Sequence, residues 1–154
     1  MDEEITVNSD KFQEVESGNN ILSMSNVVIK FTFKGKTYLA TGFDLQFSQG
    51  VDYKDLPSGE IWGGMISITI TGQVDNNIAA WMMSVNEKQD GEIHIFNNKG
   101  KVSESALMNI VFKDAYCVRY KTTLDALGSG MLTTLLISPH TLTMGNVEYK
   151  KRWK

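Results

Sequence analysis

The sequence predicts a mainly β protein, an antiparallel β-barrel of about seven or eight strands with one short amphipathic α-helix. Apolar and polar residues alternate with a period of two through most of the chain after Val27. The period becomes helical only once, after Asp75. So many strands leave many unpaired edges, and closure into a barrel removes them. A chain of 154 residues is expected to form one such domain.

The first strands form a hairpin followed by a half-buried strand. Residues 27–33 place Val, Ile and Phe side chains on one face, and the turn Lys34-Gly35-Lys36 leads into a returning strand at 37–40. Phe43, Leu45 and Phe47 then alternate with polar residues. This alternation predicts a strand with one face in the core and one in water.

Residues 49–64 interrupt the alternation and predict a long connection. The segment contains glycines and a proline, yet its apolar residues are more than a solvated loop normally carries: Tyr53, Leu56, Ile61 and Trp62. Connections of this length in a compact domain are usually functional. We therefore treat this segment as the principal candidate for a functional site.

The second half contains the helix and the remaining strands. Residues 65–71 alternate isoleucine with serine or threonine, which predicts a strand. Asp75 is a good N-cap, and Ile78, Trp81, Met82 and Val85 share one face of a helix of about three turns. Further strands are expected at 92–96, 106–113, 115–124 and 131–138, with turns at Asn97-Asn98-Lys99-Gly100 and Gly128-Ser129-Gly130.

The charge is distributed unevenly along the chain. Residues 1–25 carry six acidic residues and one lysine, and we interpret them as a mobile acidic arm ahead of a single domain at 26–154. The last eight residues carry four basic residues and one glutamate. The formal net charge of −3 argues against nucleic acid as a partner.

The sequence also predicts where the protein is made. The start of the chain has neither the basic region nor the apolar region of a secretory signal peptide. No apolar run approaches the roughly 20 residues of a membrane helix, so we expect no membrane insertion. We expect synthesis and folding in the cytoplasm and, if the protein leaves the cell, export without a cleaved signal. A single cysteine allows no internal disulfide.

The candidate catalytic and metal-binding residues do not form a convincing set. Cys117 could be paired with His94 or His140, but a cysteine within an aromatic and β-branched strand is typical of a core position. The two histidines are 46 residues apart in the sequence, and the acids of residues 52–60 lack the spacing of a calcium loop. We therefore expect no enzyme activity, no metal and no cofactor.

Several short motifs resemble the tube protein of the type VI secretion system, the Hcp (TssD) family, in its Bacteroidota-type branch. The resemblance runs from about Val27 to Trp153. The order and spacing of the matching residues are more specific than any single motif. These residues are Phe47-Ser48, Val51-Asp52, Pro57-Ser58, Gly63-Gly64, Trp81, Asp90-Gly91, Phe112-Lys113-Asp114-Ala115-Tyr116-Cys117-Val118, Tyr120, Asp125, Met131, Leu136-Ile137-Ser138-Pro139 and Trp153.

The resemblance implies a β-barrel subunit that forms a homohexameric ring. Rings of this family stack into a hollow tube inside a contractile sheath, the tube is secreted with a spike protein, and effectors can travel in the lumen. The family's subunit-contacting loop corresponds here to Val51, Asp52, Tyr53, Lys54, Asp55, Leu56, Pro57, Ser58, Gly59, Glu60, Ile61 and Trp62.

Two alternatives stay open at this point. A β-barrel module that binds a small ligand or a glycan would have a similar pattern of strands. Residues 53–57 also depart from the family's usual loop, which has a glycine and a basic residue before the proline. A specialised subunit that forms rings but stacks only on a particular partner would account for this departure.

Overall fold

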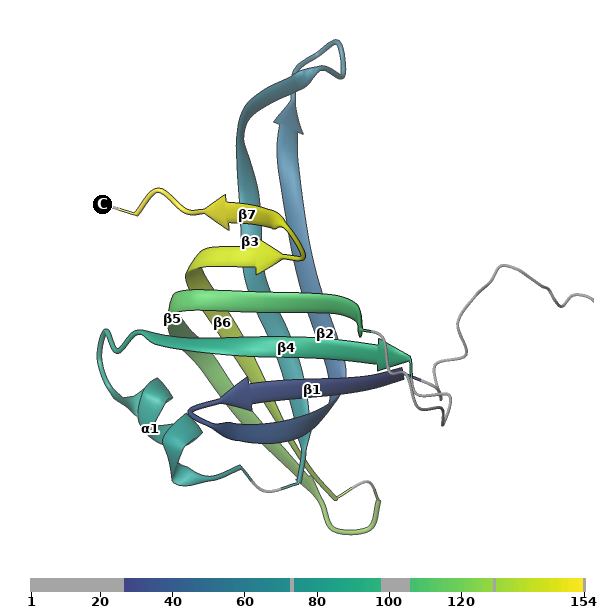
Figure 1. Ribbon diagram of the computed structural model, residues 1–154, viewed down its shortest axis with the longest axis vertical. Helices are drawn as coiled ribbons and strands as arrows, with labels where there is room; N and C mark the ends of the chain where they lie inside the picture. Colours follow the sequence, from purple (N-terminus) through teal and green to yellow (C-terminus); the bar gives the residue numbers. More distant parts are fainter. Residues whose placement is uncertain (1–26, 73, 98–105, 129, 154) are drawn as a thin grey trace, which may run out of the picture.

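The computed structural model describes residues 27–72, 74–97, 106–128 and 130–153 (Figure 1). It contains seven strands and one helix in the described residues. In chain order these are β1 (Val27–Phe33), β2 (Lys36–Val51), β3 (Pro57–Thr71), α1 (Asn76–Met83), β4 (Gln89–Asn97), β5 (Ala106–Asp125), β6 (Gly130–Met144) and β7 (Val147–Lys150).

The strands form one antiparallel sheet that closes on itself. Their order is β3-β2-β1-β4-β5-β6-β7, and an additional pairing joins β3 to β6. This pairing extends from Ile66 opposite Ile137 to Thr71 opposite Leu132. Six strands therefore make the barrel, and β7 extends the sheet by pairing with the C-terminal end of β6. The predicted fold class is confirmed.

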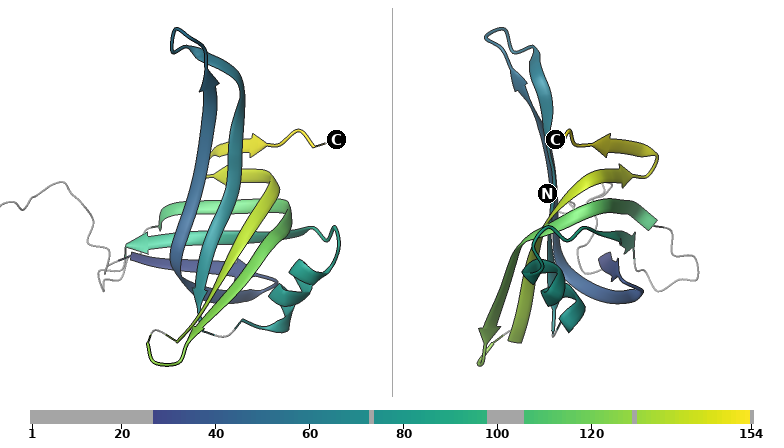
Figure 2. Two further views of the ribbon diagram at one scale, coloured as in Figure 1. Left: turned by 180° about the vertical axis from the view of Figure 1, so that it is seen from behind. Right: turned by 90° about the vertical axis from the view of Figure 1, so that its left-hand side faces the viewer.

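Strands β5 and β6 are shared between the two halves of the barrel. The first half of β5, up to Ala115, pairs with β4, whereas β6 accompanies β5 along its whole length. Asp114 has a left-handed φ of 52°, and the register shifts between Cys117 and Arg119. Such irregularities bend strands, and Figure 2 shows that both strands change direction along their length.

Stacked aromatic rings fill the barrel beside the helix. The Trp81 ring lies 4.7 Å from the Phe33 ring and 6.3 Å from the Phe112 ring, between centroids. Phe31 continues the stack at 6.2 Å from Phe112. The indole N–H of Trp81 donates to the carbonyl oxygen of Ala115 at 3.1 Å. The polar end of this large side chain is thus satisfied within the core.

The helix begins as the sequence predicts and ends sooner. The Asp75 carboxylate accepts a hydrogen bond from the Asn77 N–H, and Ile78 and Trp81 are buried. The helix ends at Met83, which makes it eight residues long instead of three turns. Val85, predicted to lie on its apolar face, lies beyond the helix and is 89% exposed. Ser84 adopts an extended conformation and ends the helix.

Several predicted boundaries were wrong. The strand expected at 37–40 and the one expected after it form the single strand β2, and the strand expected at 92–96 begins at Gln89. Residues 106–113 and 115–124 form the single strand β5, because pairing with β6 continues on both sides of Asp114. Residues 49–64 are mostly strand, and only residues 52–56 connect β2 to β3. The predicted strand 131–138 continues to Met144 and is followed by β7, which the sequence did not indicate.

Three predictions lie at least partly outside the described residues. The first is the acidic arm of residues 1–25, so the proposed division at residue 26 stays a prediction. The others are the turn predicted at residues 97–100, apart from Asn97 at the end of β4, and residue 129 of the turn predicted at 128–130.

We expect Trp81→Phe to lower the free energy of unfolding by about 2–4 kcal/mol. The change keeps an aromatic ring but removes part of the buried side chain and leaves the Ala115 carbonyl without its donor. Denaturant unfolding followed by circular dichroism measures the loss. Met83→Ala is the matched control, because this residue of the same helix is exposed and its truncation is expected to change stability little.

Candidate functional site

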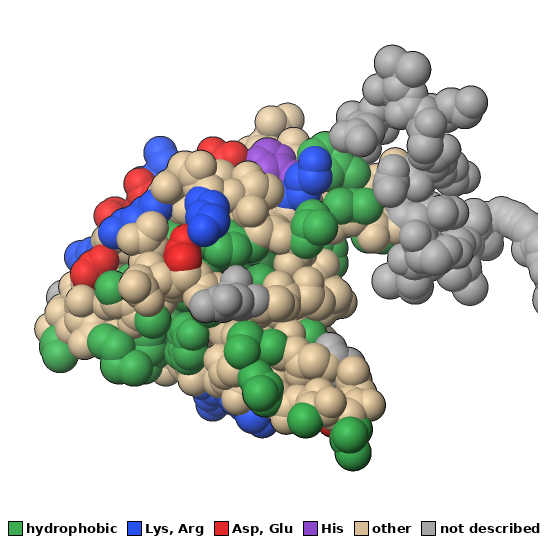
Figure 3. Space-filling model, turned by 90° about the horizontal axis from the view of Figure 1, so that it is seen from below, with side chains coloured by type: hydrophobic (Ala, Val, Ile, Leu, Met, Phe, Trp, Pro, Cys, Tyr) green, Lys and Arg blue, Asp and Glu red, His purple; other side chains and the backbone are tan. Residues whose placement is uncertain are grey.

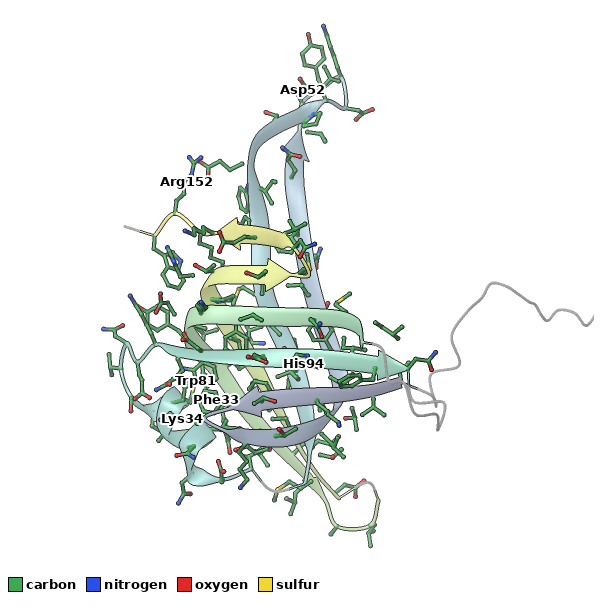
Figure 4. The ribbon with its side chains drawn as sticks, viewed as in Figure 1. Phe33, Lys34, Asp52, Trp81, His94 and Arg152 are labelled. Atoms are coloured by element: carbon green, nitrogen blue, oxygen red, sulfur yellow. The ribbon has the colours of Figure 1, made fainter. Side chains whose placement is uncertain are left out.

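The distal halves of β2 and β3 form a hairpin that extends beyond the barrel (Figures 1 and 4). Its pairing runs from Phe47 opposite Gly63 to Val51 opposite Pro57. Tyr53 at the tip is 90% exposed and Trp62 is 69% exposed, and other large apolar side chains on the hairpin are also exposed: Val51, Leu56 and Ile61. These side chains contribute little to the core of their own barrel.

Hydrogen bonds to Asp52 fix the conformation of the hairpin tip. One oxygen of its carboxylate accepts from the Lys54 N–H at 2.8 Å and from the Leu56 N–H at 3.1 Å. The Asp52 N–H also donates to the Leu56 carbonyl at 2.9 Å. Asp55 takes a left-handed φ of 63°, which aspartate tolerates in turns. Asp52, considered as a calcium ligand from the sequence, therefore supports the turn.

The base of the hairpin is held by Tyr149 of β7. Its hydroxyl donates to the Ile61 carbonyl at 3.1 Å, and its ring packs edge-on against Phe47 with 5.0 Å between centroids. Gly64 has a positive φ of 81°, and a Cβ at this position would lie 3.1 Å from the Tyr149 ring. A Cβ on Gly63 would overlap the backbone of β2. The Gly63-Gly64 pair thus permits the strand to pass between β2 and Tyr149.

Two long strand edges at the sides of the barrel have no partner strand in the described part of the molecule, besides the edge of β3 before Ile66 and the outer edge of β7. Strand β2 pairs with β1 only up to Ala40, so its outer edge is free from about residue 41 to residue 51. Strand β5 pairs with β4 only up to Ala115, so its outer edge is free from about residue 116 to residue 125. These are the two outer edges of the four-stranded sheet β2-β3-β6-β5, in which β2 and β5 run in opposite directions.

The structure brings the twelve predicted interface residues, 51–62, together on the projecting hairpin. Contact with another subunit stays a prediction. Sequence analysis missed Tyr149, because a single tyrosine in a basic tail gives no indication of a structural role. It also gave no role to Leu127, which is 99% exposed in the turn between β5 and β6. The neighbouring Gly128-Ser129-Gly130 indicated the turn but not its apolar tip.

The candidate catalytic residues are engaged separately. Cys117 is 7% exposed, and burial raises the pKa of its thiol to about 11. His94 is hydrogen-bonded to Glu92 at 2.8 Å and to Asn109 at 2.7 Å, and the Glu92 hydrogen bond raises its pKa. His140 packs against the Trp153 ring. The residues named as nucleophile and base therefore form no catalytic pair.

Neither a metal site nor a membrane-spanning helix is found in the part of the chain that the structure describes. No three potential metal-binding side chains lie close enough there to hold an ion. The one helix described, α1, is too short to cross a membrane.

A comparison with models of known protein families identifies the family of this chain. The family model described as "Hemolysin coregulated protein Hcp (TssD)" matches residues 25–154. This chain belongs to the Hcp (TssD) family. No curated protein sequence matches it significantly.

Solved Hcp structures share the fold. Hcp1 from Flavobacterium johnsoniae is 26% identical, has a TM-score of 0.73 and covers 80% of this chain and 99% of its own. Hcp1 from the E. coli EAEC 042 pathovar is 10% identical, with a TM-score of 0.62 and coverage of 84% and 99%. The secreted protein Hcp3 from Pseudomonas aeruginosa is 12% identical, with a TM-score of 0.53 and coverage of 83% and 97%.

Membership of the family establishes the role predicted from the sequence motifs. The Hcp family is a structural family, and its members are the secreted tube protein of the type VI system. This chain is accordingly a subunit of the type VI secretion tube. The barrel interior agrees with a structural role, because it is filled by side chains such as Phe31, Ile66 and Phe112 that solvent does not reach.

We expect the Cys117 thiol to react slowly with a thiol reagent in the native protein at pH 8. Its pKa of about 11 keeps it protonated, and its burial limits access. The rate of reaction with a chromogenic disulfide should be at least tenfold below that of glutathione, and urea should remove the difference.

Cys117→Ala should cost about 1–2 kcal/mol of stability and leave assembly unchanged. Loss of assembly in a folded Cys117→Ala protein would contradict this.

Proposed function

We propose that this subunit forms homohexameric rings and that the rings stack into a hollow tube through the β2–β3 hairpin. One observation carries the proposal: a hairpin with five large exposed apolar residues projects from a barrel whose own core is complete without them. Exposed apolar surface of this kind marks a protein interface. Tyrosine and tryptophan at its tip and side are residue types that dominate interface energies.

The free edges of β2 and β5 support closure of the ring. If the β5 edge of one subunit lies beside the β2 edge of the next, the strands are antiparallel, as they are throughout the sheet. Each junction would satisfy backbone groups over about ten residues on both sides, which is β-augmentation. A head-to-tail contact of this kind repeats until the rotation closes, and six copies is the number that the Hcp family resemblance implies.

The hairpin supports stacking because it extends beyond the barrel along the direction of β2 and β3 (Figure 1). Its tip is already ordered by Asp52, so little conformational entropy is lost when it docks. The spike, the contractile sheath and effectors carried in the lumen complete the proposed set of partners.

The ligand-binding barrel is the weaker candidate. The barrel interior holds tightly packed side chains, and the hollow lined by Asp44, Ser67 and Leu136 lies at the surface. We also propose that the protein is made in the cytoplasm and leaves without a signal peptide, and that the acidic residues 1–25 adjust stacking without forming the ring.

We expect light scattering coupled to size exclusion to give a mass of about 103 kDa, six times the 17.2 kDa of one chain. Unpaired β-edges favour pairing with another chain, and ring closure would supply a partner for the β2 edge and the β5 edge of every subunit. Sedimentation velocity at high micromolar concentration checks the result independently. A strictly monomeric species would refute the ring.

Replacement of Tyr53, Leu56 and Trp62 together by serine should abolish stacking and leave rings intact. These side chains lie outside the core, so the barrel should keep its circular dichroism spectrum and its cooperative unfolding. Electron microscopy distinguishes rings from tubes. The control replaces three exposed polar residues of the hairpin instead, as Lys54→Ser, Ser58→Ala and Glu60→Ser, and should leave tubes in place. Global unfolding of the apolar triple variant would show that the hairpin belongs to the core.

Deletion of residues 1–20 should leave hexamers intact and change only their higher-order association. The arm is acidic and the chain's end is basic, and exposed charges of this kind interact weakly and are screened over about 8–10 Å at physiological salt. Sedimentation at low and at physiological salt tests this, with the difference expected at low salt. Monomers after the deletion would place the arm in the ring interface.

A further inference from the structure

A small apolar cavity lies at the base of the projecting hairpin, between it and the β6–β7 turn. It has a volume of about 250 Å³. Its lining is mostly apolar and joins the two hairpins: Phe47, Ile61, Leu142, Met144, Val147, Glu148 and Tyr149. The cavity is half open to solvent, and it is larger than an enclosed apolar cavity of about 150 Å³ that can hold a benzene molecule, so a branched aliphatic side chain would fit in it. Because Ile61 and Tyr149 belong to it, the cavity is continuous with the hairpin that we propose as the stacking surface.

The opposite end of the molecule carries an isolated apolar side chain. Strand β3 runs away from the hairpin tip and β6 runs back toward it, so the β5–β6 turn lies at the far end of the sheet (Figure 1). Leu127 in this turn is 99% exposed. The Asp125 carboxylate accepts from the Leu127 N–H at 3.1 Å, which fixes the turn. Figure 3 views the molecule from this end and shows several hydrophobic side chains on its surface.

We propose that Leu127 of one subunit inserts into the cavity at the base of the hairpin of a subunit in the adjacent ring. The inference rests on the proposed stacking, because identical rings that stack in one direction bring the far end of each subunit against the hairpin end of another. The proposal identifies a contact on both of the rings that meet, whereas the hairpin alone identifies the contact surface on one ring. The occupant is a second copy of this chain.

Apolar complementarity, not charge, supports this pairing. A fully exposed leucine would enter a hollow whose lining is mostly apolar. The one charged residue of that lining is Glu148, and the basic residues that follow it in the chain, Lys150, Lys151 and Arg152, do not line the cavity.

Cysteine cross-linking between rings tests the contact directly. The Leu127→Cys, Val147→Cys double variant places one thiol on the turn and the other at the exposed rim of the cavity. The native Cys117 is buried with a raised pKa and stays unreactive at pH 8. Mild oxidation of assembled tubes should give a ladder of covalent multimers in denaturing gels. The control pair Leu127→Cys, Val85→Cys places its second thiol at a more exposed position and should give none. Tubes of the first variant that give no ladder would overturn the proposal.

Single substitutions give an independent readout. Leu127→Ser should lower the fraction of rings in tubes at least tenfold, since burial of a leucine is worth about a factor of ten or more in an equilibrium constant. Leu127→Met keeps an apolar side chain and should retain tubes. If Leu127→Ser leaves the tubes unchanged, the leucine is not the contact although the rings stack. If the unmodified protein forms no tubes under any condition, the proposed stacking itself fails, and this contact with it.

Discussion

The pairing between β3 and β6 governs the shape of this protein. It closes the barrel, yet it covers only the residues from Ile66 to Thr71 on β3. The isoleucines of that segment point into the core, and its hydroxyl side chains line the outer face, where Thr69 and Thr134 meet at 3.0 Å. The rest of β3 has no partner on this side, so it leaves the barrel together with β2. A short closure thus produces both a stable core and a projecting hairpin.

The sequence predicted the elements that depend on local pattern. Alternation identified the buried faces of β1 and β3, and Asp75 with Ile78 and Trp81 identified the helix. The extent of the hairpin could not be predicted, because its strands face water on both sides and therefore lack alternation. Glycines that resemble loop residues instead form the bulged passage at Gly63 and Gly64. Tyr149 is important only because of what it meets 88 positions earlier in the chain, at Ile61.

The residues of the predicted interface lie on paired strands instead of a loop, and their contact with another subunit stays a prediction. The exposed apolar residues expected between positions 51 and 62 are exposed, and they are held on paired strands instead of a loop. The difference has an energetic meaning, since paired strands present side chains at fixed spacing and lose less entropy on docking than a loop does. The groups with reactive chemistry are used for structure: Cys117 packs in the core, and His94 joins β4 to β5 through Asn109.

The attachment of the hairpin at Tyr149 has a mechanical consequence. A rod fixed at one end and loaded at the other experiences its greatest bending moment at the fixed end, and that is where the phenol of Tyr149 bonds Ile61 and packs against Phe47. The ion pair between Arg152 and Glu60 at 3.3 Å lies on the same side (Figure 4). In a tube that is driven forward, a push on the tip of one subunit would be passed into its barrel through β7. Strand β7 thus supports the β2–β3 hairpin, a segment nearly a hundred residues earlier in the chain.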